Sequence, residues 1–251
     1  MLYDLYTRRL RRQLSALPKP AHVAIVMDGN RRWARGAGYD DVRVGHRFGA
    51  KHLEQFLQWS ADAGVTCVTA WVASADNLSK RDSAEVDYLM ELTESVLADH
   101  VRRDHRWRLH VAGRIDLLPD STARALKEAV EVSRDRTAGD LTLAIGYSGR
   151  LEVLDAVRSV LDEAAADGHS LADVADGLTE EDIGRHLYVP GLPEPELVIR
   201  TSGELRMSDF LLWQATRSEI EFCDLYWPAF REVDLLRALR TYGHRKLQRF
   251  S

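Results

Sequence analysis

The sequence has too few cysteines and too short apolar runs for a disulfide-bonded or membrane-spanning protein. Only two cysteines, Cys67 and Cys223, occur among 251 residues, and both lie in apolar runs. This disfavours a disulfide framework and a cysteine metal site, and predicts free thiols in a reducing cytosol. No apolar stretch reaches the roughly 20 residues of a membrane span, and the first residues lack the apolar core of a signal peptide. We therefore expect a cytoplasmic protein.

An excess of positive charge is also missing. Lys and Arg number 34 against 39 for Asp and Glu, and the formal net charge is −5. Nucleic-acid binders draw much of their affinity from neutralising phosphates, so we expect no nucleic-acid partner. The glycine-rich phosphate loop G-x-x-x-x-G-K-[ST] is absent as well. Any anion site must therefore come from local clusters of cations.

What is present is an alternation of strand and helix patterns. Several strand candidates are near-continuous apolar runs, as in a sheet covered on both faces. The strand candidates are 22–27, 65–73, 107–112, 141–146 and 196–200. The helix candidates are 46–62, 83–98, 120–136, 150–165, 179–186 and 233–246. The alternation predicts a single α/β domain with a mainly parallel central sheet flanked by helices. The polar stretch 166–180 is expected to be a surface loop.

Residues 1–16 are predicted to form a short amphipathic helix, which Pro18 and Pro20 end. Its apolar face carries Tyr3, Tyr6, Leu10 and Leu14. The arginines beside this face are Arg8, Arg9, Arg11 and Arg12. The pattern fits an ordinary N-terminal helix, and it also fits one that contacts a membrane surface or a partner. We therefore divide the chain into an N-terminal helix and linker, 1–20, and one larger domain, 21–251.

Asp28 follows the apolar run 23–27 and stands before a cluster of cations. In open α/β sheets, ligands bind beyond the carboxyl ends of the strands, where this residue is expected. Gly29 lets backbone come close to a ligand. The cations are Arg31, Arg32 and Arg35. Guanidinium groups match phosphate oxygens, and a carboxylate among them suits a divalent metal that also touches phosphate. The stretch predicts a magnesium-bound diphosphate, although an N-capping Asp with surface arginines fits it as well.

Two further segments at strand ends carry similar chemistry. The segment 198–222 offers donors for a second diphosphate, namely Arg200, Ser202, Arg206 and Ser208. Within it, Glu204 is placed to orient an arginine, and Glu219 is a second oxygen ligand for the metal. The segment 74–86 adds polar residues where the first two clusters would converge, namely Ser74, Asp76, Asn77 and Arg81. Together these strand ends predict two anionic sites and one metal.

With these segments in view, the sequence resembles the cis-prenyltransferases, the family of undecaprenyl diphosphate synthase and of the shorter-chain Z-farnesyl diphosphate synthases of actinobacteria. The resemblance spans nearly the whole chain and rests on "HVAIVMDGNRRWAR", "GHRFGA", "SADN", "GYSGR", "LVIRTSGELRMSDFLLWQ" and "DLYWPAF". It implies a homodimer in which each subunit has a parallel sheet, flanking helices and an apolar tunnel, with 21–251 as the catalytic domain. It also implies Mg²⁺-dependent transfer of a prenyl group from dimethylallyl, geranyl or farnesyl diphosphate onto isopentenyl diphosphate, with a new cis double bond.

The resemblance implies a role for each matching residue. Asp28 would be a catalytic residue and a Mg²⁺ ligand, Glu219 the second ligand, and Asn77 the other catalytic residue. The matches around the allylic diphosphate are Gly29, Asn30, Arg31, Arg32, Trp33 and His46. Arg43 is a further match, in the loop before "GHRFGA", whose length differs from that in the family. Those around the reacting carbons and the following loop are Ser74, Ala75, Asp76, Leu78, Lys80 and Arg81. Those at the diphosphate of isopentenyl diphosphate are Arg200, Arg206, Met207 and Ser208.

The chain departs from the family pattern near these residues. The family's "SSEN" is "SADN" here, so Ala75 lacks a hydroxyl and Asp76 is shorter. The following loop is one residue longer, so Lys80 or Arg81 fills the family's arginine position. Arg81 is preferred, because Glu85 then keeps the i, i+4 spacing. The segment "QATRSE" carries Thr and Arg where relatives usually have Ala and an aromatic residue.

Product length is predicted from the strand 65–73. Alternate side chains of a strand face one way, so Val72 and Ser74 should share one face and Trp71 and Ala73 the other. Long-chain relatives tend to have Ala at the position of Val72, and two extra methyl groups narrow a close-packed tunnel wall. A narrower tunnel leaves less room for a growing chain. The expected product is therefore a Z-configured chain of about three or four isoprene units. A long undecaprenyl or decaprenyl chain is the alternative.

The reaction also needs a proton acceptor. A neutral amide is a poor base, so we expect Asn77 to orient the substrates and the departing diphosphate to take the proton. A non-catalytic accessory subunit is the rival function. Such a chain would have lost the metal carboxylate or the second-site arginines, whereas this one keeps Asp28, Arg200, Arg206 and Glu219.

Overall fold

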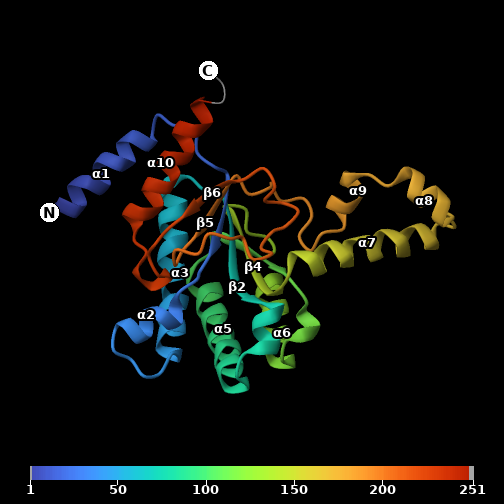
Figure 1. The fold of residues 1–251 in the computed structure, drawn as a ribbon, viewed down its shortest axis with the longest axis horizontal. Helices are drawn as coiled ribbons and strands as arrows, with labels where there is room; N and C mark the ends of the chain where they lie inside the picture. The colour runs from blue at the N-terminus through green and yellow to red at the C-terminus, as the bar shows by residue number, and fades with distance from the viewer. Residues whose placement is uncertain (1, 249–251) are drawn as a thin grey trace.

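The computed structural model describes residues 2–248, which form a six-stranded sheet in the order β3-β4-β2-β1-β5-β6 (Figure 1). The strands are β1 (His22–Val26), β2 (Cys67–Ser74), β3 (Trp107–Ala112), β4 (Gly139–Tyr147), β5 (Leu197–Arg200) and β6 (Glu219–Phe222). Every neighbouring pair is parallel. The predicted fold class is confirmed, and all five predicted strands form. β6 was not predicted; it is a four-residue strand in which Glu alternates with apolar residues.

Helices connect the strands and cover the sheet. They are α1 (Leu2–Leu14), α2 (Asn30–Gly36), α3 (Arg43–Ala63), α4 (Ala75–Lys80), α5 (Ser83–Arg103), α6 (Asp120–Ser133), α7 (Gly149–Ala166), α8 (Leu171–Gly177), α9 (Glu180–Arg185) and α10 (Glu232–Gln248), with 3-10 turns at Ile115–Leu117 and Trp227–Ala229. The helices α7 to α9 extend away from the sheet (Figure 1). The expectation of a loop over 166–180 is wrong, because Ser170 and Asp173 form a capping box that starts α8.

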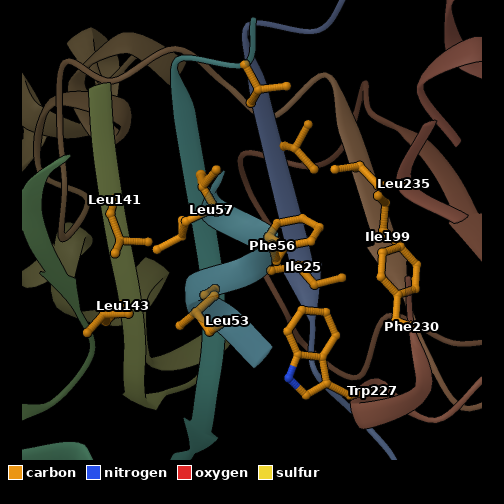
Figure 2. Close-up of a cluster of buried hydrophobic side chains, with 14 of the residues drawn as sticks. Ile25, Leu53, Phe56, Leu57, Leu141, Leu143, Ile199, Trp227, Phe230 and Leu235 are labelled. Atoms are coloured by element: carbon orange, nitrogen blue, oxygen red, sulfur yellow. The ribbon is translucent and has the colours of Figure 1, made fainter. Parts of the chain in front are cut away.

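The main core lies on the face of the sheet that α3, α5, α6 and α10 cover. Ile25 of β1 points into this core, whereas Ala24 and Val26 point to the other face, as the alternation along a strand requires. Phe56 of α3 and Trp227 pack beside Ile25 (Figure 2). Because both faces of β1 are buried, polar side chains of this segment gather where the strand ends.

Helix α1 packs along α10. Leu10 and Leu14 are buried there, and Arg11 contacts Glu232 at 2.5 Å. Leu5 stays exposed on the outer side. Among residues 2–248, no helix combines the length and the apolar character needed to cross a bilayer. A contact between α1 and a membrane surface stays a prediction.

Strand β2 contains a bulge just before the site. Its Trp71 pairs with Ala144 of β4 and Ala73 pairs with Ile145, so Val72 is an extra residue between two ladder pairs. Ala73 therefore joins the main core, while Trp71 packs in the cluster on the opposite face. The prediction that these two side chains share a face is wrong, because the bulge interrupts the alternation of the strand.

Candidate active site

The carboxyl ends of four neighbouring strands open into one cavity of about 820 Å³. Its wall includes Asp28 after β1, Ser74 at the end of β2, Ser148 after β4 and Arg200 at the end of β5. Three of these are the strand ends that we expected to converge. The predicted residues that line the cavity are Asp28, Gly29, Asn30, Arg31, Arg32, His46, Ser74, Asp76, Asn77, Arg81, Arg200 and Ser208.

The Asp28 carboxylate joins two of these strand ends. Arg200 Nη2 donates to Asp28 Oδ2 at 3.1 Å, and the Gly29 N–H donates to Asp28 Oδ1 at 2.7 Å. Arg32 Nη2 lies 3.7 Å from the same Oδ1. Gly29 has a φ of +99°, and a Cβ there would meet Tyr226 at 2.6 Å, so glycine is needed at this turn. The Asp28 side chain keeps 36% of its surface exposed, which leaves it accessible to a ligand.

One histidine and two arginines share the carboxylate of Glu85. His46 Nε2 lies 3.1 Å from Glu85 Oε1, Arg81 Nη1 lies 3.4 Å from that oxygen, and Arg31 Nη1 lies 3.6 Å from Oε2. Burial lowers the pKa of His46 below its usual 6.5, against the opposing effect of the hydrogen bond to Glu85. Burial thus favours the neutral ring, which can donate a hydrogen bond from Nε2 to the Glu85 carboxylate.

Helix α4 starts directly at the end of β2. Ser74 caps it by accepting the Asn77 N–H at 3.0 Å, and Asn77 and Arg81 both line the cavity. Lys80 instead pairs with Asp76 at 2.5 Å, and its side chain is 71% exposed. This geometry favours Arg81 over Lys80 as the cation that faces a substrate.

Arg200 holds the second cluster together. Its Nη1 donates to Ser208 Oγ at 2.8 Å and to the backbone carbonyl of Arg206. Glu204 accepts hydrogen bonds from Arg206 at 2.5 Å and from Arg32 at 3.4 Å, so it orients arginines of both clusters as expected. The Arg206 side chain itself is 65% exposed.

Several predicted residues lie outside the lining of the cavity. They are Trp33, Arg43, Ala75, Leu78, Lys80, Ser202, Glu204, Arg206, Met207 and Glu219. Trp33 packs against Phe48 with 4.9 Å between ring centroids, and Arg43 pairs with a carboxylate of its own loop at 2.9 Å. Leu78 and Met207 pack against apolar clusters on opposite faces of the sheet. Leu78 and Met207 therefore pack beside the cavity and do not line it.

Glu219 is far from Asp28 within one chain. It opens β6 and pairs in register with Leu197 of β5, which pairs with Val23 of β1. Asp28 lies five residues beyond Val23, or roughly 16 Å at about 3.3 Å per residue. The Glu219 carboxylate accepts a hydrogen bond from Arg245 at 3.2 Å. A single chain therefore does not bring the two expected metal ligands together, and the metal role of Glu219 stays a prediction.

A smaller, apolar cavity of about 80 Å³ adjoins the first. The residues that line both cavities are Met27, Asn30, His46, Trp71 and Val72. The remaining walls come from α3, α5, β4 and Trp227, and include Leu53, Leu89, Leu92, Thr93, Val96 and Leu143. An apolar compartment thus opens directly from the polar one, as the predicted tunnel requires.

Known proteins share this architecture. A family model described as putative undecaprenyl diphosphate synthase matches residues 26–251. The chain belongs to this family. It is 55% identical over 249 residues to an isoprenyl transferase of Streptomyces fradiae, with 98% of this chain and 96% of that protein covered. It is 48% identical over 247 residues to a (2Z,6E)-farnesyl diphosphate synthase of Thermobifida fusca, with 98% and 95% covered.

A solved structure has the same fold. The crystal structure of lavandulyl diphosphate synthase from Lavandula x intermedia, in complex with dimethylallyl diphosphate, matches with a TM-score of 0.82 and 30% identity. The match covers 90% of this chain and 95% of that chain.

The cavity of this cis-prenyltransferase has a fourth wall that the sequence analysis missed. Tyr147 at the end of β4 and Ser148 and Arg150 at the start of α7 form it, together with Asp209. The motif "GYSGR" carried the family resemblance but was given no role. A signal was present, because this motif also follows the end of a predicted strand, as the other three polar segments do.

Proposed function

We propose that the chain condenses isopentenyl diphosphate with an allylic prenyl diphosphate and releases diphosphate and a short Z-configured prenyl diphosphate. One observation carries this proposal: a single cavity joins two arginine clusters around Asp28 and opens into an apolar compartment. The two arginine clusters suit two diphosphates, and the apolar compartment suits one hydrocarbon chain. The printed names of the relatives, isoprenyl transferase and (2Z,6E)-farnesyl diphosphate synthase, point the same way.

The residues present fit a magnesium ion that is shared with substrate. Mg²⁺ is commonly bound through one or two carboxylates together with substrate phosphates and water. Asp28 offers one exposed carboxylate at a wall that is otherwise rich in arginine. Asp28 would hold the ion, which when bound would help to neutralise charge on the departing diphosphate.

The arginines prepare the cavity for anions. Arg200 is buried, and among residues 2–248 its Nε has no hydrogen-bond partner. An unsatisfied buried donor on a cavity wall suits a ligand oxygen. Arg31 and Arg32 stand at the start of α2, where they would stabilise charge that develops on the allylic diphosphate as its C–O bond breaks.

The reacting carbons would meet between the two clusters. Holding the isopentenyl double bond against the ionised prenyl group makes the step effectively intramolecular. Asn77 lines this part of the cavity and would orient the substrates. The departing diphosphate would then accept the proton whose loss forms the alkene, because a neutral amide is a poor base.

The size of the apolar cavity supports a short product. The apolar cavity is about 80 Å³, below the roughly 150 Å³ that holds one benzene molecule, so it must widen even for a short prenyl chain and far more for a long one. Val72, at the bulge of β2, lines both compartments and narrows the passage between them. A chain of ten or more isoprene units would require a large displacement of α3 or α5. A non-catalytic accessory role is disfavoured by the Asp28–Arg200 pair, which is intact.

We further propose the assembly that the family resemblance implies, a homodimer of this chain. Analytical ultracentrifugation tests it, and a monomer under turnover conditions would refute it. The reaction itself is tested by incubating the protein with isopentenyl diphosphate, Mg²⁺ and dimethylallyl, geranyl or farnesyl diphosphate, and identifying the dephosphorylated products by chromatography. No prenyl product from any of the three would refute the proposed function.

A further inference from the structure

The backbone of the second cluster is strained. Among residues 2–248, the non-glycine residues with positive φ are Ser202, Ser208, Asp209 and Leu211. Residues with a Cβ rarely adopt this conformation, and they persist in it only where the surroundings hold them. All of them lie in the ten-residue stretch 202–211, which carries the predicted ligands of the second diphosphate. Something outside this stretch must fix its shape.

Helix α7 provides the first attachment. Asp209 Oδ2 accepts a hydrogen bond from Ser148 Oγ at 2.5 Å, and Asp209 Oδ1 accepts one from the Arg150 N–H at 3.0 Å. The Asp209 carbonyl accepts the Gly149 N–H at 2.9 Å. A Cβ on Gly149 would meet that carbonyl at 2.6 Å, so this close approach requires glycine. Asp209 thus uses its side chain and its backbone to bind the first turn of another element.

A second attachment follows five residues later. Glu152, on the same turn of α7, is buried and accepts hydrogen bonds from Gln214 Nε2 at 3.1 Å and from the Tyr147 hydroxyl at 2.5 Å. The segment between Asp209 and Gln214 is therefore tied to α7 at both ends.

The first attachment is adjacent to the anion site. Ser208 precedes Asp209, is also left-handed with a φ of +52°, and accepts the 2.8 Å hydrogen bond from Arg200. Arg200 in turn contacts Asp28. A change of backbone at 208–209 would move the Ser208 hydroxyl and release the Arg200 guanidinium from its position.

We propose that Asp209 is a positioning residue for the diphosphate of isopentenyl diphosphate. By binding the first turn of α7, it holds Ser208 in its left-handed conformation and so presents the Ser208 hydroxyl and Arg200 to the anion. The inference rests on the proposed function and adds a residue that acts through Ser208 and Arg200. A cap that only stabilised α7 would affect both substrates alike, whereas the positioning role affects one.

The test compares Asp209→Ala and Asp209→Asn with Asp173→Ala. Asp173 is a matched control, because its carboxylate also accepts a Ser hydroxyl and a backbone N–H, in the capping box of α8. For each variant, KM is measured for isopentenyl diphosphate and for the allylic substrate. Calorimetric titration with isopentenyl diphosphate alone gives Kd without turnover.

Asp209→Ala should raise KM and Kd for isopentenyl diphosphate about tenfold or more, the scale of losing one hydrogen bond to a charged group. The allylic KM should stay within about twofold, since the first cluster keeps its own contacts. Asp209→Asn should recover most of the affinity, because its amide oxygen still accepts one bond and its NH₂ can donate to Ser148 Oγ. Asp173→Ala should leave all these constants unchanged.

Equal rises for both substrates, an unchanged Kd, or an Asn variant as defective as the Ala variant would overturn the positioning role. If Asp209→Ala does not fold, Ser148→Ala removes one of the bonds and should raise the same Kd by a smaller factor; no rise would count equally against the proposal. A wild-type protein that forms no prenyl product would refute the proposed function instead. Inorganic diphosphate titrated into wild type and Asp209→Ala would then still test the anion site, with weaker binding expected for the variant.

Discussion

Asp28 and Arg200 show how single residues unite the site. The two side chains come from segments 172 residues apart in the sequence and meet at 3.1 Å where β1 and β5 end. Removing one partner of such a pair leaves the other charge uncompensated, which costs more than the pair contributes. Each residue therefore serves both the shape of the cavity and its charge.

Asp28→Ala should lower kcat by at least about 100-fold, because metal-assisted stabilisation of the leaving group supplies several kcal/mol. Turnover is measured at saturating substrates over a range of Mg²⁺ concentrations, with circular dichroism to check the fold. Asp162→Ala, an exposed carboxylate on α7, is the control and should match wild type. Near-normal turnover of Asp28→Ala that still requires metal would remove Asp28 from the mechanism.

Arg206→Ala should separate the two anion sites. Arg206 pairs with Glu204 in the second cluster and is a predicted ligand of isopentenyl diphosphate. Its loss should therefore raise KM for isopentenyl diphosphate by about 10- to 100-fold, as expected for one hydrogen bond to a charged group. The allylic KM should change much less. Steady-state kinetics with each substrate varied in turn make the test, and Arg158→Ala, an exposed arginine paired on α7, is the control. The reverse pattern would mean that the two sites are exchanged.

At the scale of elements, strand β2 borders the apolar cavity through Val72, which lines both compartments. Val72 lies on the same face as Val68 and Ala70, and the bulge turns Ala73 into that core as well. The helices α3 and α5 supply the opposite wall. We therefore expect Val72 and these two helices together to limit the length of the product.

Val72→Ala should lengthen the product. The variant removes two methyl groups from the narrow passage, and packed interiors relax only partly around such a loss. Chromatography of dephosphorylated products from wild type, Val72→Ala and the control Val132→Ala, an exposed valine on α6, tests this. Wild-type chains of ten or more units would refute the narrowing argument. Unchanged short products from Val72→Ala would place the limit elsewhere, for example on α5 at Leu89 or Thr93.

Elements that consist of buried apolar runs could be predicted from the sequence, and those fixed by tertiary contacts could not. The strand around Ile25 and the polar end at Asp28 follow from composition and from the rule that ligands bind beyond strand ends. The short strand that starts at Glu219 and the bulge at Val72 depend on neighbouring strands, which local patterns do not report. Asp209 was missed for the same reason, because its partners lie on α7.

At the scale of the whole molecule, four buried histidines couple stability to pH. Burial lowers the pKa of His22, His46, His52 and His100 below the usual 6.5. The folded chain thus favours the neutral rings, and the unfolded chain binds more protons at acidic pH. The free energy of unfolding should keep the full contribution of these histidines above about pH 6.5. As the pH falls below 6.5, it should decrease by up to roughly 1.4 kcal/mol per histidine and pH unit.

Urea unfolding at pH values from 8 to 5.5 measures this decline. Burial raises the pKa of Glu152, which acts in the opposite sense, so the histidines are followed one by one through their NMR resonances. Glu152→Gln removes the opposing contribution. Histidine pKa values at or above 6.5 in the folded protein would contradict the prediction.

The strand order also has a consequence for biosynthesis. β1 lies between β2 and β5, and the Thr201 hydroxyl beyond β5 donates to the Val26 carbonyl across 175 residues of sequence. A ribosome adds about 5–20 residues per second, so roughly 10 to 30 s pass between the emergence of these two segments. During that time one edge of β1 is unpaired and can pair with the strands of other nascent chains. Slow, long-range pairing of this kind exposes the growing chain to aggregation until β5 emerges.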